Sequence, residues 1–395
     1  MIRPIAQALY MAAAMGWKML WALILGFMIS GVIQALVSRR EMAKALPDAH
    51  AGTIVKAALL GAASSSCSYA AVAIARSVVK RGGDFTAAMA FQFASTNLVI
   101  ELGLILWSLL GWRFTLAQLA GGVVMVAVLT VLLRLFMRGR LLEEAVRTAR
   151  GEARGRMEGH AEMDMAAAQG EPFLRRLISA EGFTAVSHFF VSDVAMLWRD
   201  ILGGLLISGA LAAWVPAAVW AGLFATHDPV LARLVGPLLG PLVAIAAFVC
   251  SVGNVPLAAV LWSAGASFGG VIAFLFADLI VLPVLDIYRR YYGWRAAGML
   301  LVLFYAAMAI SAYGVELAFG ALRLTPAVQA PGAAVMKMGF AFDYTTWLNL
   351  VLLVPAGILA WRFLTTGGPA MLKMMDAPAG EHHGRGGGDH AADGP

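Results

Sequence analysis

The sequence predicts an all-α, polytopic membrane protein, and three observations support that prediction. Of the 395 residues, 61% are hydrophobic and 13% are charged, whereas soluble domains are about 45–50% apolar and about 25% charged. The apolar residues form runs of the ~20 residues that a membrane-spanning helix needs. Two cysteines are too few for a disulfide framework, and the high apolar content excludes a disordered chain.

The net charge of +6 does not predict a nucleic-acid partner. Most arginines stand in short clusters beside apolar runs, a pattern that sets membrane orientation through the positive-inside rule. We therefore expect the lipid bilayer as the main partner, and no nucleic acid.

Nine apolar runs are long enough to predict membrane-spanning helices. In order, they cover residues 19–37, 54–75, 85–110, 114–136, 201–223, 237–262, 268–287, 296–319 and 344–364. The first run ends at Ser38-Arg39-Arg40 rather than at a small-residue cleavage site. It therefore predicts a retained helix and not a removed signal peptide.

These runs divide the chain into five regions. Spans one to four occupy 1–137, a polar basic linker 138–200, spans five to eight 201–320, a loop and the ninth span 321–365, and a disordered tail rich in glycine and histidine 366–395. Within the linker, Phe183 to Trp198 is amphipathic and predicts a helix that lies on the membrane surface.

The charge pattern leaves the orientation of the second half open. The basic linker favours a cytoplasmic location, but strict alternation of the spans then places Arg289, Arg290 and Arg295 outside. Either one segment fails to cross the membrane fully, or the second half is inverted.

The second half of the chain repeats the first at a constant offset, the one that places Cys67 on Cys250. Without gaps, the same offset places Gly82 on Gly265 and the segment 90–94 on 273–277. It also carries span one onto span five and span four onto span eight. We predict two four-helix repeats plus one extra C-terminal helix, a build typical of secondary transporters. A helix-packing arrangement used twice, without transport, is the alternative.

Small and hydroxyl residues characterise the second and sixth spans. The second span contains Ser65, Ser66, Cys67 and Ser68, and its counterpart contains Cys250, Ser251, Gly253, Asn254 and Pro256. Gly253 weakens a helix and Pro256 removes a backbone donor. We therefore expect broken helices in spans 2 and 6, with the break near Cys250, whose backbone groups bind a substrate. Close packing of small residues is the alternative, and the serines fit both equally.

The third span carries the candidate substrate-binding residues Gln92, Ser95, Thr96 and Asn97 and the acid Glu101. Because Asn97 and Glu101 are four residues apart, they predict a shared helix face. The residue that matches Ser95 in the second half is Asp278. A carboxyl inside a span is costly and is functional by default, so we expect Glu101 and Asp278 to couple transport to protons. For Glu101, a hydrogen bond between helices is the alternative.

Cys67 and Cys250 have two interpretations. A lone buried cysteine is usually a small apolar filler, whereas two thiols at matching positions present ligands for a soft metal. The sequence has no Walker loop and no HExxH, GxSxG or paired CxxC motif. We therefore expect no enzymatic activity, no ATP coupling and no cofactor.

The repeated segments resemble the bacterial predicted-permease family that includes the ArsP-type organoarsenical efflux permeases. The likeness rests on Ser65 to Ser68, Ala90 to Glu101, Cys250 to Ala258 and Phe268 to Phe274. The family often has Cys-x-Cys-Ser at the first motif, where this chain has Ser65 in the first Cys position, and Ala71 stands where a proline is common.

The resemblance implies a multi-pass permease of the bacterial inner membrane. It further implies export of a small solute, and soft metal or metalloid compounds are one class that fits the remaining thiols. A membrane-embedded assembly factor that binds a metal or a partner subunit without moving a solute is the alternative function.

Overall fold

The protein is all-helical in the part that the structure, a computed structural model, describes. The described residues are 2–36, 46–64, 68–151, 179–216, 219, 228–247, 251–326 and 344–376. Every regular element among them is a helix, which confirms the prediction of an all-α protein.

Six of the described helical segments are long and apolar enough to cross a membrane. They are Pro4–Val32, Phe85–Leu110, Trp112–Phe136, Val230–Ala247, Trp294–Ala321 and Tyr344–Thr365. A seventh is obtained if Phe268–Leu279 and Leu282–Tyr292, which meet at a 43° bend, count as one span. The predicted runs 54–75, 201–223 and 237–262 each include residues outside the described part of the chain.

Within two of these runs, the structure describes a shorter helix on each side of the residues that it leaves out. The run 54–75 falls on α3 (Ala51–Ser64) and α4 (Ser68–Lys80), and the run 237–262 on α13 (Pro229–Ala247) and α14 (Ser251–Ser263). At 1.5 Å per residue, a helix of 14 residues such as α3 is about 21 Å long, short of the ~30 Å hydrocarbon core.

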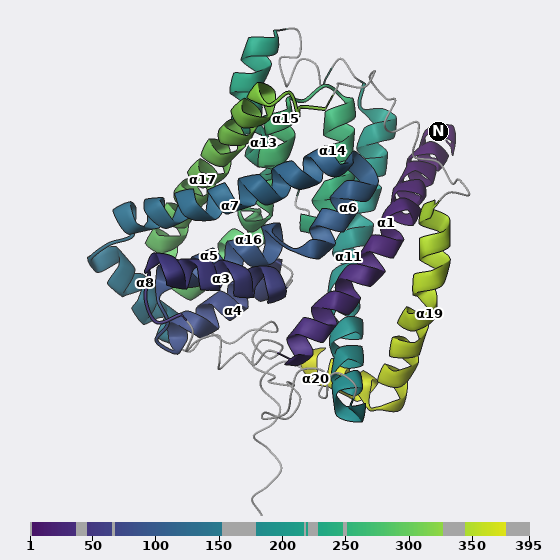
Figure 1. Ribbon diagram of the computed structural model, residues 1–395, viewed down its shortest axis with the longest axis horizontal. Helices are drawn as coiled ribbons and strands as arrows, with labels where there is room; N and C mark the ends of the chain where they lie inside the picture. The colour runs from purple at the N-terminus through teal and green to yellow at the C-terminus, as the bar shows by residue number, and fades with distance from the viewer. Residues whose placement is uncertain are drawn as a thin grey trace, which may run out of the picture.

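Three long helices form one side of the molecule, where α1 (Ile2–Leu36), α11 (Ala180–Trp214) and α19 (Tyr344–Thr365) lie side by side (Figure 1). Helices α1 and α11 run antiparallel. Trp214, at the end of α11, donates from its indole nitrogen to the carbonyl of Pro4 (3.1 Å), and Ser30 donates to Asp193 (3.3 Å).

Small residues let the backbones of α1 and α11 approach closely. A Cβ added to Gly209 would lie 3.0 Å from both the Cβ and the backbone nitrogen of Ala12. A Cβ added to Gly31 would lie 3.1 Å from the carbonyl oxygen of Val186 and 3.3 Å from the nitrogen of Phe190. This is the usual way in which membrane helices pack tightly.

The predicted surface helix, Phe183 to Trp198, is the first half of α11 in the structure. Helix α11 continues through residue 200 without a break, so no element boundary falls at the end of the predicted linker. Val186, Phe189 and Phe190 are buried. Because α11 packs along α1 at these residues, the apolar face of the segment meets protein.

The rest of the described chain packs as two groups of helices joined by α7 (Trp112–Phe136) (Figure 1). Helix α3 packs on α5 (Phe85–Asn97), and α13 packs on α15 (Phe268–Phe276). Helix α17 (Trp294–Ala321) contacts both α7 and α15. Each inner helix begins with a side-chain cap: Asp84 accepts from the backbone N–H of Ala87 (2.9 Å), and Ser267 accepts from that of Gly270 (3.1 Å).

A buried arginine fixes the start of the polar linker. Arg76 of α4 donates from Nε to the carbonyl of Ala149 (3.2 Å) and from Nη2 to that of Gly151 (2.8 Å). These carbonyls lie at the C-terminal end of α8 (Arg140–Arg150), where a cation also suits the helix dipole. The guanidinium lies 4.5 Å from the ring centroid of Tyr291 in α16 (Leu282–Tyr292), so Arg76 joins three helices.

Gly253 and Pro256 do not interrupt the helix in which they lie. Helix α14 runs through both residues from Ser251 to Ser263, and the missing N–H of Pro256 removes only the bond to the carbonyl of Val252. Cys250, near which we expect the break, lies outside the described residues. Past Thr365, the predicted tail begins with a further helix, α20 (Gly368–Asp376).

Candidate functional site

The third candidate span is interrupted at its middle. Helix α5 ends at Asn97, and α6 (Ile100–Leu110) begins after Val99, whose backbone is extended (φ −88°, ψ 144°). An interruption at membrane depth is tolerated where the backbone is buried in protein or lines a cavity. Asn97 is 1% exposed and Val99 6% exposed, so the interruption lies in the protein interior.

A second interruption lies in the bent pair of the other half. Helix α15 is followed by the 3-10 turn η1 (Ala277–Leu279), and α16 starts after the extended residue Val281 (φ −64°, ψ 148°). Helix axes change direction by 43° across this break. The structure therefore has its described breaks in the spans 85–110 and 268–287, and not at Gly253 or Pro256.

Asp278 brings the two interruptions together. This carboxyl lies in η1 and is fully buried. Ser68, at the start of α4, donates its hydroxyl to Oδ2 of Asp278 (2.7 Å), and Asn97, at the end of α5, donates from Nδ2 to Oδ1 (3.4 Å). Both donors come from the first half of the chain and the acceptor from the second. We call Ser68, Asn97 and Asp278 the polar cluster.

Two further amides extend the polar cluster into neighbouring helices. Gln118 of α7 donates from Nε2 to Oδ1 of Asn97 (3.1 Å), which leaves Nδ2 of Asn97 directed to Thr96 (3.0 Å) and Asp278. Gln92 of α5 donates to the hydroxyl of Tyr288 in α16. The sequence reasoning missed Gln118 and Tyr288. Gln118 stands in an apolar run just as Glu101 does, and that signal could have found it.

The hydroxyls of Ser95 and Thr96 are partly engaged by their own helix. Ser95 donates to the carbonyl of Gln92 (2.9 Å) and Thr96 to that of Phe93 (3.3 Å). Such local bonds satisfy a buried hydroxyl without any ligand. Of the predicted candidates in this span, Gln92 and Asn97 make side-chain hydrogen bonds with the second half, to Tyr288 and Asp278.

The chemistry of the polar cluster follows from its charges. The two donors to Asp278 are neutral. A buried carboxylate is expensive unless a cation pairs with it or a proton neutralises it. The arrangement is therefore suited to exchange a proton or to hold a cation or a polar solute beside the carboxyl.

Asn97 and Glu101 do not share a continuous helix face, so that prediction is wrong. The break at Leu98 and Val99 separates them and removes the i,i+4 relation. Glu101 lies in the first turn of α6, where the helix dipole favours a carboxylate. Its side chain packs against α1, since a Cβ added to Gly26 would lie 3.0 Å from the Cδ of Glu101.

Asn254 is a second buried amide that the sequence predicts at the site. It is fully buried in α14, which contacts η1, and neither atom of its side-chain amide has a hydrogen-bond partner among the described residues. An unsatisfied buried amide calls for an explanation such as a bound ligand or an ordered water. Its neighbour Ser251 is also buried.

The thiol hypothesis stays a prediction. Ser65, Ser66, Cys67 and Cys250 lie outside the described residues. Within the described residues, no group of three or more His, Cys, Asp or Glu side chains is placed to hold a metal ion.

Glu316 is a buried acid that the sequence reasoning did not single out. In α17, it accepts the backbone N–H of Gly269 in the first turn of α15, and its Oε1 lies 3.6 Å from Nε of Arg233. It therefore caps α15 across the helix interface. The signal that could have found it is again an acid within an apolar run, 296–319.

Comparisons with known proteins agree with a membrane permease. The ArsP_1 family model, described as "Predicted permease", matches residues 4–317. A protein of Mycobacterium tuberculosis named "Putative permease Rv2963" is 52% identical over 347 residues, which are 87% of this chain and 85% of that protein. No solved structure shows a significant match to the chain.

Proposed function

Because this chain belongs to the ArsP_1 family of predicted permeases, we propose that it is a secondary transporter whose solute passes the polar cluster around Asp278. One observation carries the proposal: a fully buried carboxyl of the second half is held by two donors of the first half, between two interrupted spans. Secondary transporters bind substrates and coupling ions at such interruptions, where two repeats meet.

The transporter is built from two inverted repeats. The offset that carries Cys67 onto Cys250 in the sequence also carries both ends of α4 (Ser68–Lys80) onto the ends of α14 (Ser251–Ser263). The same offset carries Leu98, where the first span is interrupted, onto Val281, where the bent pair is interrupted. These matches support a structural repeat that follows the repeat in the sequence.

The packing of α1 and α11 supports the inversion. A slightly smaller offset carries Gly31 of α1 onto Gly209 of α11, and it also carries Ala8 onto Val186 and Ala12 onto Phe190, the partners of the two glycines. Gly31 of α1 thus packs on Val186 and Phe190 of α11. Its counterpart Gly209 packs on Ala8 and Ala12 of α1, the counterparts of those two residues. Because the two helices run antiparallel, corresponding helices have opposite directions, as in repeats related by an axis in the membrane plane.

Asp278 couples transport to protons. With neutral donors around it, the carboxyl is neutralised by a proton in one state of the cycle and by the solute or by water in the other. Glu101, which follows Asn97 by four residues and packs on α1, is the second predicted carrier and acts where α1 meets α6.

Export of a soft metal or metalloid compound from the cytoplasm of a bacterium is the activity that we propose for the site. Cys67 directly precedes Ser68, which binds Asp278, and Cys250 precedes Ser251. Thiolates are the preferred ligands of soft metals, and both lie next to the described site in sequence.

Uptake into inside-out membrane vesicles with an imposed pH gradient tests this function. The panel contains trivalent organoarsenicals, Ag⁺ and Cd²⁺, each at several pH gradients. We expect gradient-driven accumulation of at least one of them, and loss of it in the double variant Cys67→Ser, Cys250→Ser.

Two outcomes would contradict the proposal. Unchanged accumulation of every transported thiophile by the double cysteine variant would remove the thiols from the substrate site. Stoichiometric binding to the purified protein, with no flux for any panel member, would instead favour the membrane-embedded binding factor.

A further inference from the structure

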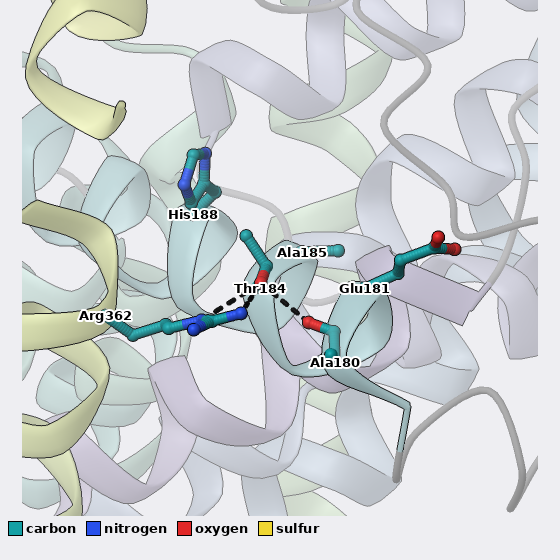
Figure 2. A pocket seen from close by; sticks show the side chains of 6 residues that line it. All are labelled: Ala180, Glu181, Thr184, Ala185, His188 and Arg362. Carbon is teal, nitrogen blue, oxygen red and sulfur yellow. Dashed lines mark hydrogen bonds between the residues drawn. The ribbon is translucent and has the colours of Figure 1, made fainter. Parts of the chain in front are cut away.

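An open pocket lies between the first turns of α11 and the last turn of α19, on the side of the molecule that α1, α11 and α19 form and not at the polar cluster (Figure 2). Its volume is about 370 Å³, and it is lined by Ala180, Glu181, Thr184, Ala185, His188 and Arg362. Ligand-binding pockets have volumes of roughly 300–1,000 Å³, so the space is large enough for a small polar group.

Hydrogen bonds to Thr184 position the guanidinium of Arg362 and leave some of its N–H donors unused. Its Nε and Nη2 both donate to the hydroxyl oxygen of Thr184 (3.1 and 2.9 Å), which in turn donates to the carbonyl of Ala180 (2.6 Å). The dashed lines in Figure 2 mark these bonds. Two of the five N–H donors of the guanidinium are thus used by the described residues. A planar guanidinium with free donors matches the geometry of a phosphate.

His188 adds a neutral acceptor beside the arginine. Its Nε2 lies 2.8 Å from the hydroxyl oxygen of Thr366, and that hydroxyl donates to the carbonyl of Arg362 (2.7 Å). Nε2 must therefore carry the proton of this bond, which leaves Nδ1 as an acceptor in the neutral ring. Burial, with a smaller effect from the charge of Arg362, lowers the pKa of His188 from its usual value, which favours the neutral imidazole.

The charged side chains that line the pocket are therefore the guanidinium of Arg362 and the carboxylate of Glu181. Glu181 lines the same pocket, and Figure 2 shows its carboxylate directed away from the guanidinium of Arg362. The pocket presents a positive group and a negative group on separate sides, as a zwitterionic ligand requires.

The residues around Arg362 are typical of the depth of the lipid headgroups. Arg362 is in the last turn of α19, which is a candidate membrane span. Its neighbours Trp361 and Leu364 are 70% and 61% exposed and face away from the protein. Tryptophan is enriched at the boundary of the hydrocarbon core, and arginine places its charged end there.

We propose that this pocket binds the headgroup of a zwitterionic phospholipid with a primary ammonium group. The phosphate accepts from the free N–H donors of Arg362, the ammonium pairs with Glu181, and the acyl chains follow the exposed apolar face of α19. An anionic headgroup fits less well, because it lacks the ammonium and meets the carboxylate of Glu181.

Native mass spectrometry of the full chain tests the proposal. Purified protein is incubated with equal amounts of phosphatidylethanolamine and phosphatidylglycerol, and the retained lipid is counted. We expect the wild type to retain phosphatidylethanolamine in several-fold excess. Arg362→Gln should reduce its retention about tenfold, as loss of a charge-assisted contact does, and Glu181→Gln should bring the ratio of the two lipids close to one.

The matched control is Arg134→Gln, because Arg134 stands in the last turn of another candidate span, α7. It should retain lipid as the wild type does. If Arg362→Gln fails to fold, Arg362→Lys keeps the charge but not the planar fork, and should still lose most of the retention.

Three results would overturn the proposal. Wild-type retention by Arg362→Gln or Arg362→Lys would remove the site, and equal retention of both lipids by the wild type would remove the zwitterionic match. Displacement of the lipid by millimolar inorganic phosphate would assign the pocket to free phosphate instead of a membrane lipid.

Discussion

Replacing Gly209 by alanine tests the antiparallel packing of α1 and α11, on which the inverted repeat depends. A Cβ at this position would lie 3.0 Å from the Cβ and from the backbone nitrogen of Ala12, and closer still to the carbonyl oxygen of Ala8. Carbon atoms in good contact are about 3.5–4.0 Å apart. Two of the three neighbours are backbone atoms of α1, which cannot rotate away, so the helices must separate.

The expected cost follows from that crowding. Inserting one methyl group into a packed interface costs about 1–3 kcal/mol. Gly203, in the same helix, is the matched control, because a Cβ there would have no neighbour within 4 Å. Gly203→Ala should therefore gain up to about 1 kcal/mol of helix propensity. Gly31→Ala should lie between the two, since its nearest neighbours would be 3.1 and 3.3 Å away.

Thermal unfolding of the full chain in one detergent measures these differences as apparent Tm. The expected order, from the most to the least stable, is Gly203→Ala, wild type, Gly31→Ala and Gly209→Ala. The two extremes should differ by about 2 kcal/mol or more. Equal apparent Tm values for Gly209→Ala and Gly203→Ala would refute the close approach of α1 and α11.

Three further predictions concern other parts of the molecule. Asp48 accepts from the hydroxyl of Thr53 (2.6 Å) and from the backbone N–H of His50 (3.0 Å), which lower its pKa from 3.8 to about 2. Its stabilisation of the start of α3 should therefore be present above about pH 4 and be lost as the pH falls toward 2. The hydrogen-exchange rates of the α3 amides should therefore differ between Asp48→Asn and the wild type above about pH 4, and should become equal as the pH falls toward 2. Arg76→Gln removes the donor to the carbonyls at the end of α8, and unpaired buried carbonyls cost about 1–3 kcal/mol. Trypsin should therefore cleave the linker faster in Arg76→Gln than in the control Arg81→Gln. Equal cleavage rates in the two variants would contradict this prediction. Gln118→Leu removes a donor to the polar cluster and should lower the transport rate about tenfold while the protein stays folded by circular dichroism; an unchanged rate would exclude Gln118 from the site.

Much of the helical layout can be predicted from apolar runs alone. The runs 85–110, 114–136, 296–319 and 344–364 agree with candidate spans of the structure within a few residues. For the last three runs, hydropathy succeeds because a membrane helix must satisfy its backbone internally over the whole hydrocarbon core. For 85–110, it locates the span but not the interruption after Asn97. The runs 54–75 and 201–223 include residues outside the described part of the chain, and their described helical residues lie in α3, α4 and α11.

Local sequence rules do not predict the positions of the helix breaks. Gly253 and Pro256 are the residues that such rules select, yet α14 continues through both. The break after Asn97 contains Leu98 and Val99, with no glycine or proline. It is accompanied by contacts of Asn97 with Asp278 and Gln118, which are tertiary and therefore invisible to a local pattern.

The members of the polar cluster could be predicted as candidates, but not their contacts. Ser68, Asn97 and Asp278 stand out as polar residues within apolar runs. The contacts of Asp278 span 210 residues to Ser68 and 181 to Asn97. An internal repeat predicts that its halves meet, but it does not say which side chains do so.

Proton movement in the variant Asp278→Asn tests whether the carboxyl of Asp278 couples transport to protons. Full-chain protein is reconstituted into vesicles that contain a pH-sensitive dye, and a solute identified in the vesicle panel is added. Asp286→Asn is the matched control, because Asp286 lies in the same bent pair but is 37% exposed and is paired with Arg289. We predict that wild type and Asp286→Asn show solute-dependent proton flux and that Asp278→Asn folds but shows none. Solute-dependent proton flux at the wild-type rate in Asp278→Asn would contradict the account.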